Sequence, residues 1–182
     1  MRICIIGSGG IGGYFGGRLA AAGNEVVFFA RGAHLAAMRA DGLHVQSALG
    51  AVHVHPVHAT DDPAALAASD LVIIAVKLWS TADAIEAAAP AMRDDSAIVS
   101  LQNGVEAVSL LSRRFGRERV LGGLAQISAL IESPGVIRHN GTLQRLVFGE
   151  LDRRRTPRVE AFLSACLAAG IDAHVSDDIE RA

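Results

Sequence analysis

Residues 2–13 read RICIIGSGGIGG, an apolar run that passes directly into a glycine-rich turn. The run at residues 2–6 is typical of a strand that is buried on both faces, as strands of parallel sheets are. Small and apolar residues at 11–22 then predict a helix, which ends at Gly23. This order of strand, tight turn and helix is the unit from which doubly wound α/β sheets are built.

The alternation of strand and helix patterns continues along the chain. Buried strands alternate with helices at residues 25–30, 33–40, 70–76, 81–92, 96–102 and 105–115. Residues 43–47 and 51–57 alternate around a turn, which indicates a hairpin. Pro63 is placed to open a short alanine-rich helix.

After residue 120 the strand pattern predominates. Three strands that could form an antiparallel set are predicted at residues 120–132, 135–140 and 144–150. Pro134-Gly135 and Asn140-Gly141 mark the turns between them, and a helix at 156–169 and a strand at 171–175 follow. The whole pattern predicts a Rossmann-like, doubly wound, mostly parallel sheet with antiparallel additions.

The composition is that of an ordinary globular chain. Its 182 residues, 51% of them hydrophobic and 20% charged, suggest one domain, or one domain with a fragment of another. A net charge of −2 gives no bulk attraction to nucleic acid or to an anionic membrane. No stretch approaches the roughly 18 apolar residues of a membrane span, and Cys4 and Cys166 lack metal-type spacing. We therefore expect a cytoplasmic protein without nucleic-acid or membrane partners.

The glycines of the first turn each have a physical task. Gly7 permits the tight turn out of the strand, and Gly9 leaves the backbone open to a pyrophosphate. Gly12 lets the helix pack closely on the strand, and the helix N-terminus offers free N–H groups to phosphate oxygens. We therefore expect a dinucleotide to bind the loop made of Gly7, Ser8, Gly9, Gly10, Ile11 and Gly12.

Arg31 indicates which dinucleotide binds. In NAD-binding sheets an acidic residue about 20 positions after the loop takes the ribose 2′-hydroxyl. Arg31 lies 19 positions after Gly12 (31 − 12), and no acidic residue stands beside it. A planar guanidinium suits a 2′-phosphate, which favours NADP over NAD. The alternative interpretation is a surface arginine at the end of a strand.

Two polar residues follow the later strands. Lys77 comes directly after the apolar run at 71–76, and Asn103 occupies the corresponding place after the next strand. The carboxyl ends of parallel strands share the edge at which such sheets bind ligands. Each residue is a candidate site residue, and each could equally be an ordinary polar residue at a strand end.

Together these features resemble the ketopantoate reductase (2-dehydropantoate 2-reductase) family. The resemblance runs in order through nearly the whole chain. It uses the glycine loop extended to Gly13, Ala30-Arg31-Gly32, Val76-Lys77 with Trp79, Leu101-Gln102-Asn103-Gly104 and Phe148-Gly149-Glu150. The spacing of Lys77 from the Gln-Asn-Gly segment is more specific than the loop alone.

The resemblance implies an activity and roles for site residues. The family reduces 2-dehydropantoate to (R)-pantoate with NADPH, in pantothenate and coenzyme A biosynthesis, so the implied partner is a small 2-oxo acid. The loop and Arg31 would bind the dinucleotide, and Lys77 and Asn103 would lie near the nicotinamide. Asn103 would also face the substrate, and Ser128 would be a further cofactor contact.

The resemblance also places part of the family's architecture beyond this sequence. The family's proton donor is a lysine on a helix just past the cofactor domain, and a helical second domain supplies further substrate groups. Lys77 is the only lysine here, so we expect no catalytic proton donor before Ala182. We expect residues 1–175 to form the NADP-binding domain, and residues 176–182 to begin a truncated helix leading to an absent C-terminal helical domain.

Two alternatives stay open. The chain could be a stand-alone, non-catalytic NADP-binding module, or the reductase could act on another 2-oxo acid or an imine. A reading frame that continues past Ala182 would favour the reductase, and a natural stop codon there would favour the module. Absence of a helical domain would expose apolar surface near residues 171–182, from which we expect a homodimer or aggregation.

Other features are interpreted as structural. His44, His53, His55 and His58 cluster in the hairpin region, but no Cys, Asp or Glu completes a ligand set, so we expect a polar strand face and no metal site. Trp79 could flank a cleft or be a partly buried core indole.

Overall fold

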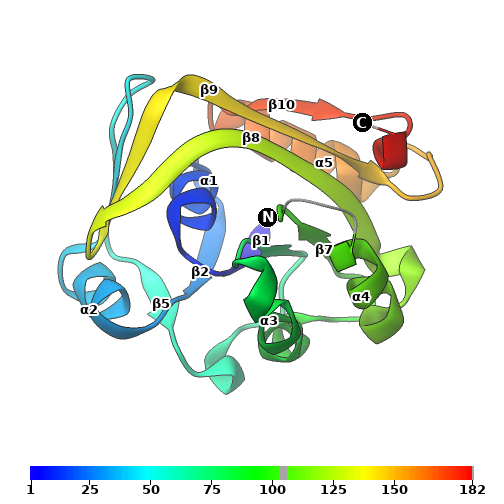
Figure 1. Cartoon of the computed structure of the whole chain (residues 1–182), viewed down its shortest axis with the longest axis horizontal. Helices are drawn as coiled ribbons and strands as arrows, with labels where there is room; N and C mark the ends of the chain where they lie inside the picture. The colour runs from blue at the N-terminus through cyan, green and yellow to red at the C-terminus, as the bar shows by residue number, and fades with distance from the viewer. Residues whose placement is uncertain (103–105, 182) are drawn as a thin grey trace.

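The computed structural model of the protein describes residues 1–102 and 106–181. Within these residues ten strands form one sheet, against which five α-helices pack (Figure 1). The strands are β1 (Arg2–Ile6), β2 (Glu25–Phe29), β3 (Leu43–Gln46), β4 (Val52–Val54), β5 (His58–Thr60), β6 (Leu71–Ile74), β7 (Ala97–Ser100), β8 (Val120–Ser133), β9 (Val136–Glu150) and β10 (Asp172–Val175). The helices are α1 (Gly10–Ala21), α2 (Gly32–Asp41), α3 (Thr81–Ala88), α4 (Glu106–Phe115) and α5 (Pro157–Ala168).

The parallel half of the sheet has the order β7-β6-β1-β2-β5. Alternate residues of β1 contribute to two separate cores, one on each face. Ile3 and Ile5 belong to the core that includes α1, and Cys4 and Ile6 to the core that includes α3 and α4. This burial on both faces explains why the strand sequences are continuous apolar runs. The predicted doubly wound sheet is confirmed.

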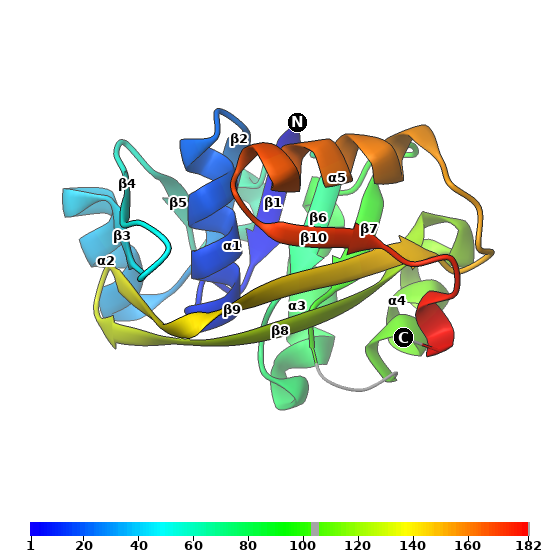
Figure 2. The same cartoon turned by 90° about the horizontal axis from the view of Figure 1, so that it is seen from above.

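A long antiparallel ribbon of β8 and β9 extends the sheet. β8 begins parallel to β7 and then arches over α1, as Figures 1 and 2 show. α1 is therefore enclosed between the parallel strands and the ribbon. Small residues permit this enclosure, because a Cβ on Gly13 would lie 2.7 Å from Ile137 of β9, and a Cβ on Gly16 would lie 2.6 Å from Phe28 of β2.

Residues 136–150 form one strand, where the sequence predicted two strands joined by a turn at Asn140-Gly141. The Asn-Gly pair falls at a break in the ribbon, where the pairing of β8 with β9 shifts between Ile127 and Ala129. The extra residues of β9 bulge out opposite Ser128. Because a β-bulge bends a strand without ending it, the predicted turn was wrong.

The structure differs from three further predictions at other places in the chain. The strand predicted at 51–57 is shortened to β4, and an unpredicted strand, β5, follows it and pairs parallel with β2. Pro56 lies between them and has no N–H with which to continue a ladder. Pro63 opens only one turn of 3-10 helix. The helix predicted at 81–92 ends at Ala88, after which a 3-10 turn follows.

The last described residues pack onto the ribbon. β10 pairs parallel with β9, and Ile179–Arg181 forms a 3-10 turn where the sequence predicted the start of a helix. A Cβ on Gly122 would lie 2.6 Å from the Ile179 side chain, so this turn lies directly against β8. No helix among the described residues has both the length and the apolar character to cross a membrane.

Candidate functional site

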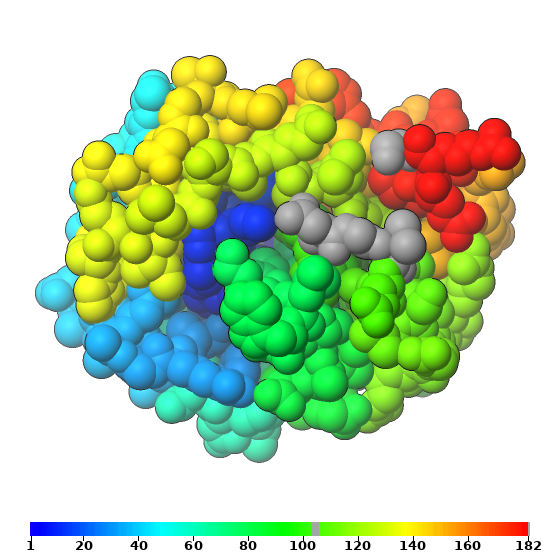
Figure 3. Space-filling model, viewed as in Figure 1, coloured from blue at the N-terminus to red at the C-terminus, as the bar shows by residue number. Residues whose placement is uncertain are grey.

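A cleft opens at the carboxyl ends of the parallel strands. Two adjoining hollows form it, and both have Gly7, Gly9 and Val76 on their walls. Arg31 lines one hollow and Lys77 lines the other, and we call them the Arg31 hollow and the Lys77 hollow. Figure 3 shows the blue N-terminal residues at the floor of this depression, between the green segment around α3 and the yellow-green β8. Doubly wound sheets bind their ligands at this edge.

The glycine loop leaves its backbone open to the cleft. Gly7 has a φ of 99°, which favours glycine, and a Cβ on Gly12 would collide with the Gly7 carbonyl oxygen. Around Gly9, in contrast, a Cβ would meet no atom within 4 Å. α1 begins at Gly10, and no side chain caps its first N–H groups. Bare amides at a helix N-terminus beside open space fit a diphosphate.

Arg31 lies between β2 and α2, on the wall that it shares with Ser8 and Gly9. Its exposed guanidinium lies over the Phe29 ring, with Cζ 5.2 Å from the ring centre. Within the part of the chain that the structure describes, no ion pair joins Arg31 to a carboxylate. The arrangement suits an anionic group in this hollow.

The side chains of Ser8 and His34 hold the glycine loop in place through hydrogen bonds to backbone groups. The buried Ser8 hydroxyl donates a hydrogen bond to Phe29 O at 3.0 Å. His34 Nε2 lies 2.9 Å from Ser8 O, and the Gly135 N–H donates to His34 Nδ1 at 3.0 Å. Burial lowers the pKa of His34, an effect that the hydrogen bond to Ser8 opposes. No sequence pattern marks His34, because its partners lie 26 and 101 residues away along the chain.

The Lys77 hollow contains two of the three predicted residues for the far end of the cofactor. Lys77 follows β6 and is exposed, and Ser128 of β8 is exposed on the wall of the same hollow. Trp79, in the 3-10 turn η2 (Leu78–Ser80), also lines this hollow and is 85% exposed, so its interpretation as a partly buried core indole was wrong. Asn103 lies outside the described residues.

Gln102 fixes the backbone next to Lys77. Its buried side chain donates from Nε2 to Val76 O at 3.0 Å and to Thr81 Oγ1 at 2.8 Å. The Ser100 hydroxyl in turn donates to Gln102 Oε1 at 3.1 Å. The sequence marked Gln102 only as part of a motif, and its bonds show that it ties the ends of β6 and β7 to α3.

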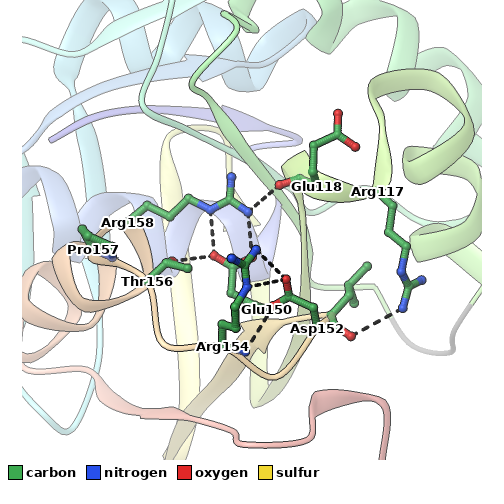
Figure 4. A pocket seen from close by; sticks show the side chains of 9 residues that line it. Arg117, Glu118, Glu150, Asp152, Arg154, Thr156, Pro157 and Arg158 are labelled. Carbon is green, nitrogen blue, oxygen red and sulfur yellow. Dashed lines mark hydrogen bonds and ion pairs between the residues drawn. The ribbon is translucent and has the colours of Figure 1, made fainter.

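A separate hollow lies between the end of β9 and the start of α5, as Figure 4 shows. The buried Glu150 accepts hydrogen bonds from Arg158 at 2.8 and 2.7 Å, and Thr156 donates to the same carboxylate. Arg154 pairs with Asp152. The carboxylates of Glu150 and Asp152 are thus paired with arginines within the protein, and none of the predicted site residues lines this hollow. We assign it a structural role in joining α5 to the sheet.

Three of the four clustered histidines, His44, His53 and His55, form a stacked row on the hairpin. The rings of His44 and His53 lie parallel with their centres 4.0 Å apart, and the His55 ring lies 5.9 Å from that of His53. Among the described residues, no three His, Cys, Asp or Glu side chains converge as metal ligands.

Comparisons with known proteins identify relatives of the whole chain. The sequence profile of the family described as "Ketopantoate reductase PanE/ApbA" matches residues 3–153. The uncharacterized oxidoreductase YkpB of Bacillus subtilis is 34% identical over 181 residues, which are 100% of this chain and 59% of YkpB. A 2-dehydropantoate 2-reductase of Mesorhizobium japonicum is 34% identical over 98% of this chain and 61% of its own length.

A solved structure supports the same relationship. The crystal structure of 2-dehydropantoate 2-reductase from Geobacter metallireducens superposes with a TM-score of 0.93 at 31% identity. The superposition covers 100% of this chain and 60% of the Geobacter chain. The chain therefore spans about three fifths of the length of these relatives.

Proposed function

The chain belongs to the ketopantoate reductase family, and from this premise we propose that residues 1–175 are the NADPH-binding part of a 2-dehydropantoate 2-reductase. The observation that carries the proposal is the open backbone around Gly9, with Arg31 on the wall of the same hollow. A diphosphate needs bare amides, and a ribose 2′-phosphate needs a cation within reach. The relatives named 2-dehydropantoate 2-reductase support the choice of reaction.

In this proposal the two hollows take the two ends of the dinucleotide. The diphosphate rests on the loop from Gly7 to Gly12, at the N-terminus of α1. The adenosine end lies in the Arg31 hollow, where the guanidinium makes paired, charge-assisted hydrogen bonds to the 2′-phosphate. The nicotinamide end lies in the Lys77 hollow, with Ser128 as a further cofactor contact.

When bound, the reduced nicotinamide would supply a hydride to the keto carbon of a 2-oxo acid. We assign Lys77 and Asn103 to this end of the cleft, and Asn103 also to the substrate. An ammonium group at the mouth of the hollow attracts an anionic carboxylate, so Lys77 favours approach of a 2-oxo acid. Exposed Trp79 lines the same hollow, beside Lys77.

The reaction also needs a proton for the carbonyl oxygen, and a positioned acid contributes about 10²- to 10⁴-fold to such a step. Lys77 is the only lysine of the sequence and is assigned here to the cofactor. Because this chain spans about three fifths of its relatives' length, the complete reaction is proposed for a protein of the relatives' length. We expect the 182-residue chain to bind NADPH and to turn over 2-dehydropantoate slowly or not at all.

Trp79 provides a direct test, because it is the single tryptophan of the chain and lines the Lys77 hollow. Addition of NADPH should quench indole emission and excite the nicotinamide by energy transfer. Trp79→Phe should remove this signal while calorimetric binding persists. If the unmodified chain showed neither quenching nor binding heat, the proposal would be refuted. Rapid oxidation of NADPH in the presence of 2-dehydropantoate would contradict the expectation that this chain turns over slowly or not at all.

A further inference from the structure

His34 connects three segments that surround the Arg31 hollow. Its ring lies between Ser8 O, 2.9 Å from Nε2, and the Gly135 N–H, whose nitrogen is 3.0 Å from Nδ1. Ser8 belongs to the glycine loop, and Gly135 to the turn between β8 and β9. His34 itself lies in the first turn of α2, three residues after Arg31. One side chain therefore joins loop, helix and ribbon.

The two contacts fix the protonation state of the ring. A backbone N–H can only donate, so Nδ1 must present its lone pair to Gly135. Nε2 then carries the proton and donates it to Ser8 O. Only the neutral imidazole with its proton on Nε2 satisfies both neighbours, because an imidazolium would set two N–H groups against each other. Burial favours the same form, since it lowers the pKa of His34.

The segments joined by His34 form the walls of the cleft. Ser8 is held a second time through its hydroxyl, which donates to Phe29 O. A Cβ on Gly10 would collide with the Ala129 carbonyl, so β8 lies directly against the start of α1. Ile131, four residues before Gly135, lines the Arg31 hollow from β8. A displacement of the β8–β9 turn would therefore move both the loop and a wall of this hollow.

We propose that His34 is a positioning residue. In its neutral Nε2–H form it holds the glycine loop, the start of α2 and the β8–β9 turn in the arrangement that binds the adenosine end of the dinucleotide. This inference rests on the proposed function. A site that is already ordered binds more tightly, because less conformational freedom is lost on binding. His34 also lines the Arg31 hollow, but both of its ring nitrogens are used within the protein, so it offers no hydrogen bond to a ligand there.

The test measures binding of NADPH, NADH and 2′,5′-ADP to the unmodified chain, His34→Ala and His34→Gln. His34→Ala should weaken NADPH about tenfold, the worth of one or two hydrogen bonds, and should weaken 2′,5′-ADP similarly. The preference for NADPH over NADH should narrow, because Arg31 is the N-cap residue of α2, the helix that contains His34. His34→Gln keeps one donor and one acceptor and should recover most of the affinity. The matched control is His58→Ala, an exposed histidine of β5, which should bind as the unmodified chain does.

A second measurement needs no variant. A long-range ¹H–¹⁵N spectrum of the unmodified chain at neutral pH should show His34 protonated at Nε2 alone. A His34 ring protonated at Nδ1 or at both nitrogens would overturn the inference even if His34→Ala failed to fold.

The outcomes separate the two proposals. Normal NADPH binding by the unmodified chain, with equal binding by a folded His34→Ala, would overturn the role of His34 and leave the proposed function standing. Equal weakening of NADPH and NADH, without recovery in His34→Gln, would reduce His34 to a structural residue. Failure of the unmodified chain to bind NADPH would overturn the proposed function, and with it this inference.

Discussion

At the scale of single residues, the cleft combines one bare stretch of backbone with one cation. The open space at Gly9 and the first N–H groups of α1 provide donors without a side chain in the way. Arg31 provides charge on the wall of the same hollow and stacks on Phe29, which limits the orientations that its guanidinium can take. The selectivity between the two dinucleotides should therefore depend on Arg31 and little on the loop.

Arg31→Ala should convert a selective site into an unselective one. Loss of charge-assisted hydrogen bonds to a 2′-phosphate should weaken NADPH roughly 10- to 100-fold, whereas NADH, which lacks this phosphate, should change little. Calorimetric titration of both cofactors measures the ratio. Arg39→Ala, which removes an exposed arginine within α2, serves as the control. A loss of affinity shared equally by NADPH and NADH would contradict this role of Arg31.

His34 should make stability depend on pH. Its pKa in the folded state lies below its ordinary value of 6.5, so the unfolded chain binds the proton more readily. The stability that its neutral form contributes is therefore complete above about pH 6.5 and is lost as the pH falls through the lower folded pKa. Urea unfolding at about pH 7.5 and about pH 5 should show a smaller difference for His34→Gln than for the unmodified chain. Equal differences in the two proteins would show that the pKa of His34 does not differ between the folded and the unfolded chain.

At the scale of elements, α1 is placed where a helix of ordinary residues would not fit. The parallel strands contact it on one side and the β8–β9 ribbon on the other, so its glycines face neighbours in several directions. Its N-terminus is the one part that opens to the cleft. A side chain added inside the enclosure should affect stability, and one added at the open end should affect binding.

Gly9→Ala and Gly12→Ala test this difference directly. Ala at Gly9 meets open space and suits its φ of −72°, so the loss of stability should be about 1 kcal/mol or less, while NADPH affinity should fall at least about tenfold. Ala at Gly12 collides with the Gly7 carbonyl and should cost about 1–3 kcal/mol of unfolding free energy. Denaturant unfolding and calorimetry measure the two quantities. A Gly9→Ala variant that binds NADPH normally would show that the diphosphate lies elsewhere.

Glu150 should stabilise the junction of β9 with α5. Its side chain is buried and accepts from both Arg158 and Thr156 (Figure 4), so Glu150→Gln leaves a partly buried guanidinium without its carboxylate. We expect a loss of about 2–4 kcal/mol in the free energy of unfolding, below the full cost for a wholly buried pair. The control Asp152→Asn breaks an exposed pair and should leave the free energy of unfolding nearly unchanged, because solvent screens such a pair. Equal losses in the two variants would contradict the account of this junction.

At the scale of the whole molecule, most parallel strands and the antiparallel partner strands of the ribbon could be predicted from sequence, whereas the uninterrupted length of β9 and the short strand β5 could not. Strands such as β6 are continuous apolar runs, and Gly7 and Gly12 mark the first turn, so local sequence is sufficient there. The turn signal at Asn140-Gly141 was overridden by the pairing of β9 with β8, which depends on residues far away in sequence. β5 was missed because its three residues become a strand only beside β2.

The residues of the candidate site also differ in whether the sequence could predict them. Arg31, Lys77 and the loop could be predicted, because each directly follows a predicted strand. His34 and Gln102 could not be assigned a role, because each acts through hydrogen bonds to backbone that only the folded chain brings near. Local pattern therefore identifies groups that line the cleft, and tertiary structure identifies the groups that hold them in place.

We propose that the cleft at the carboxyl ends of β1 and β2 holds a dinucleotide with a 2′-phosphate. Calorimetric titration of the unmodified chain with NADPH and with NADH tests this proposal. We expect NADPH to bind at least about tenfold more tightly, since the two differ only in the phosphate assigned to Arg31. Equal affinities, or no binding of either cofactor, would contradict the account.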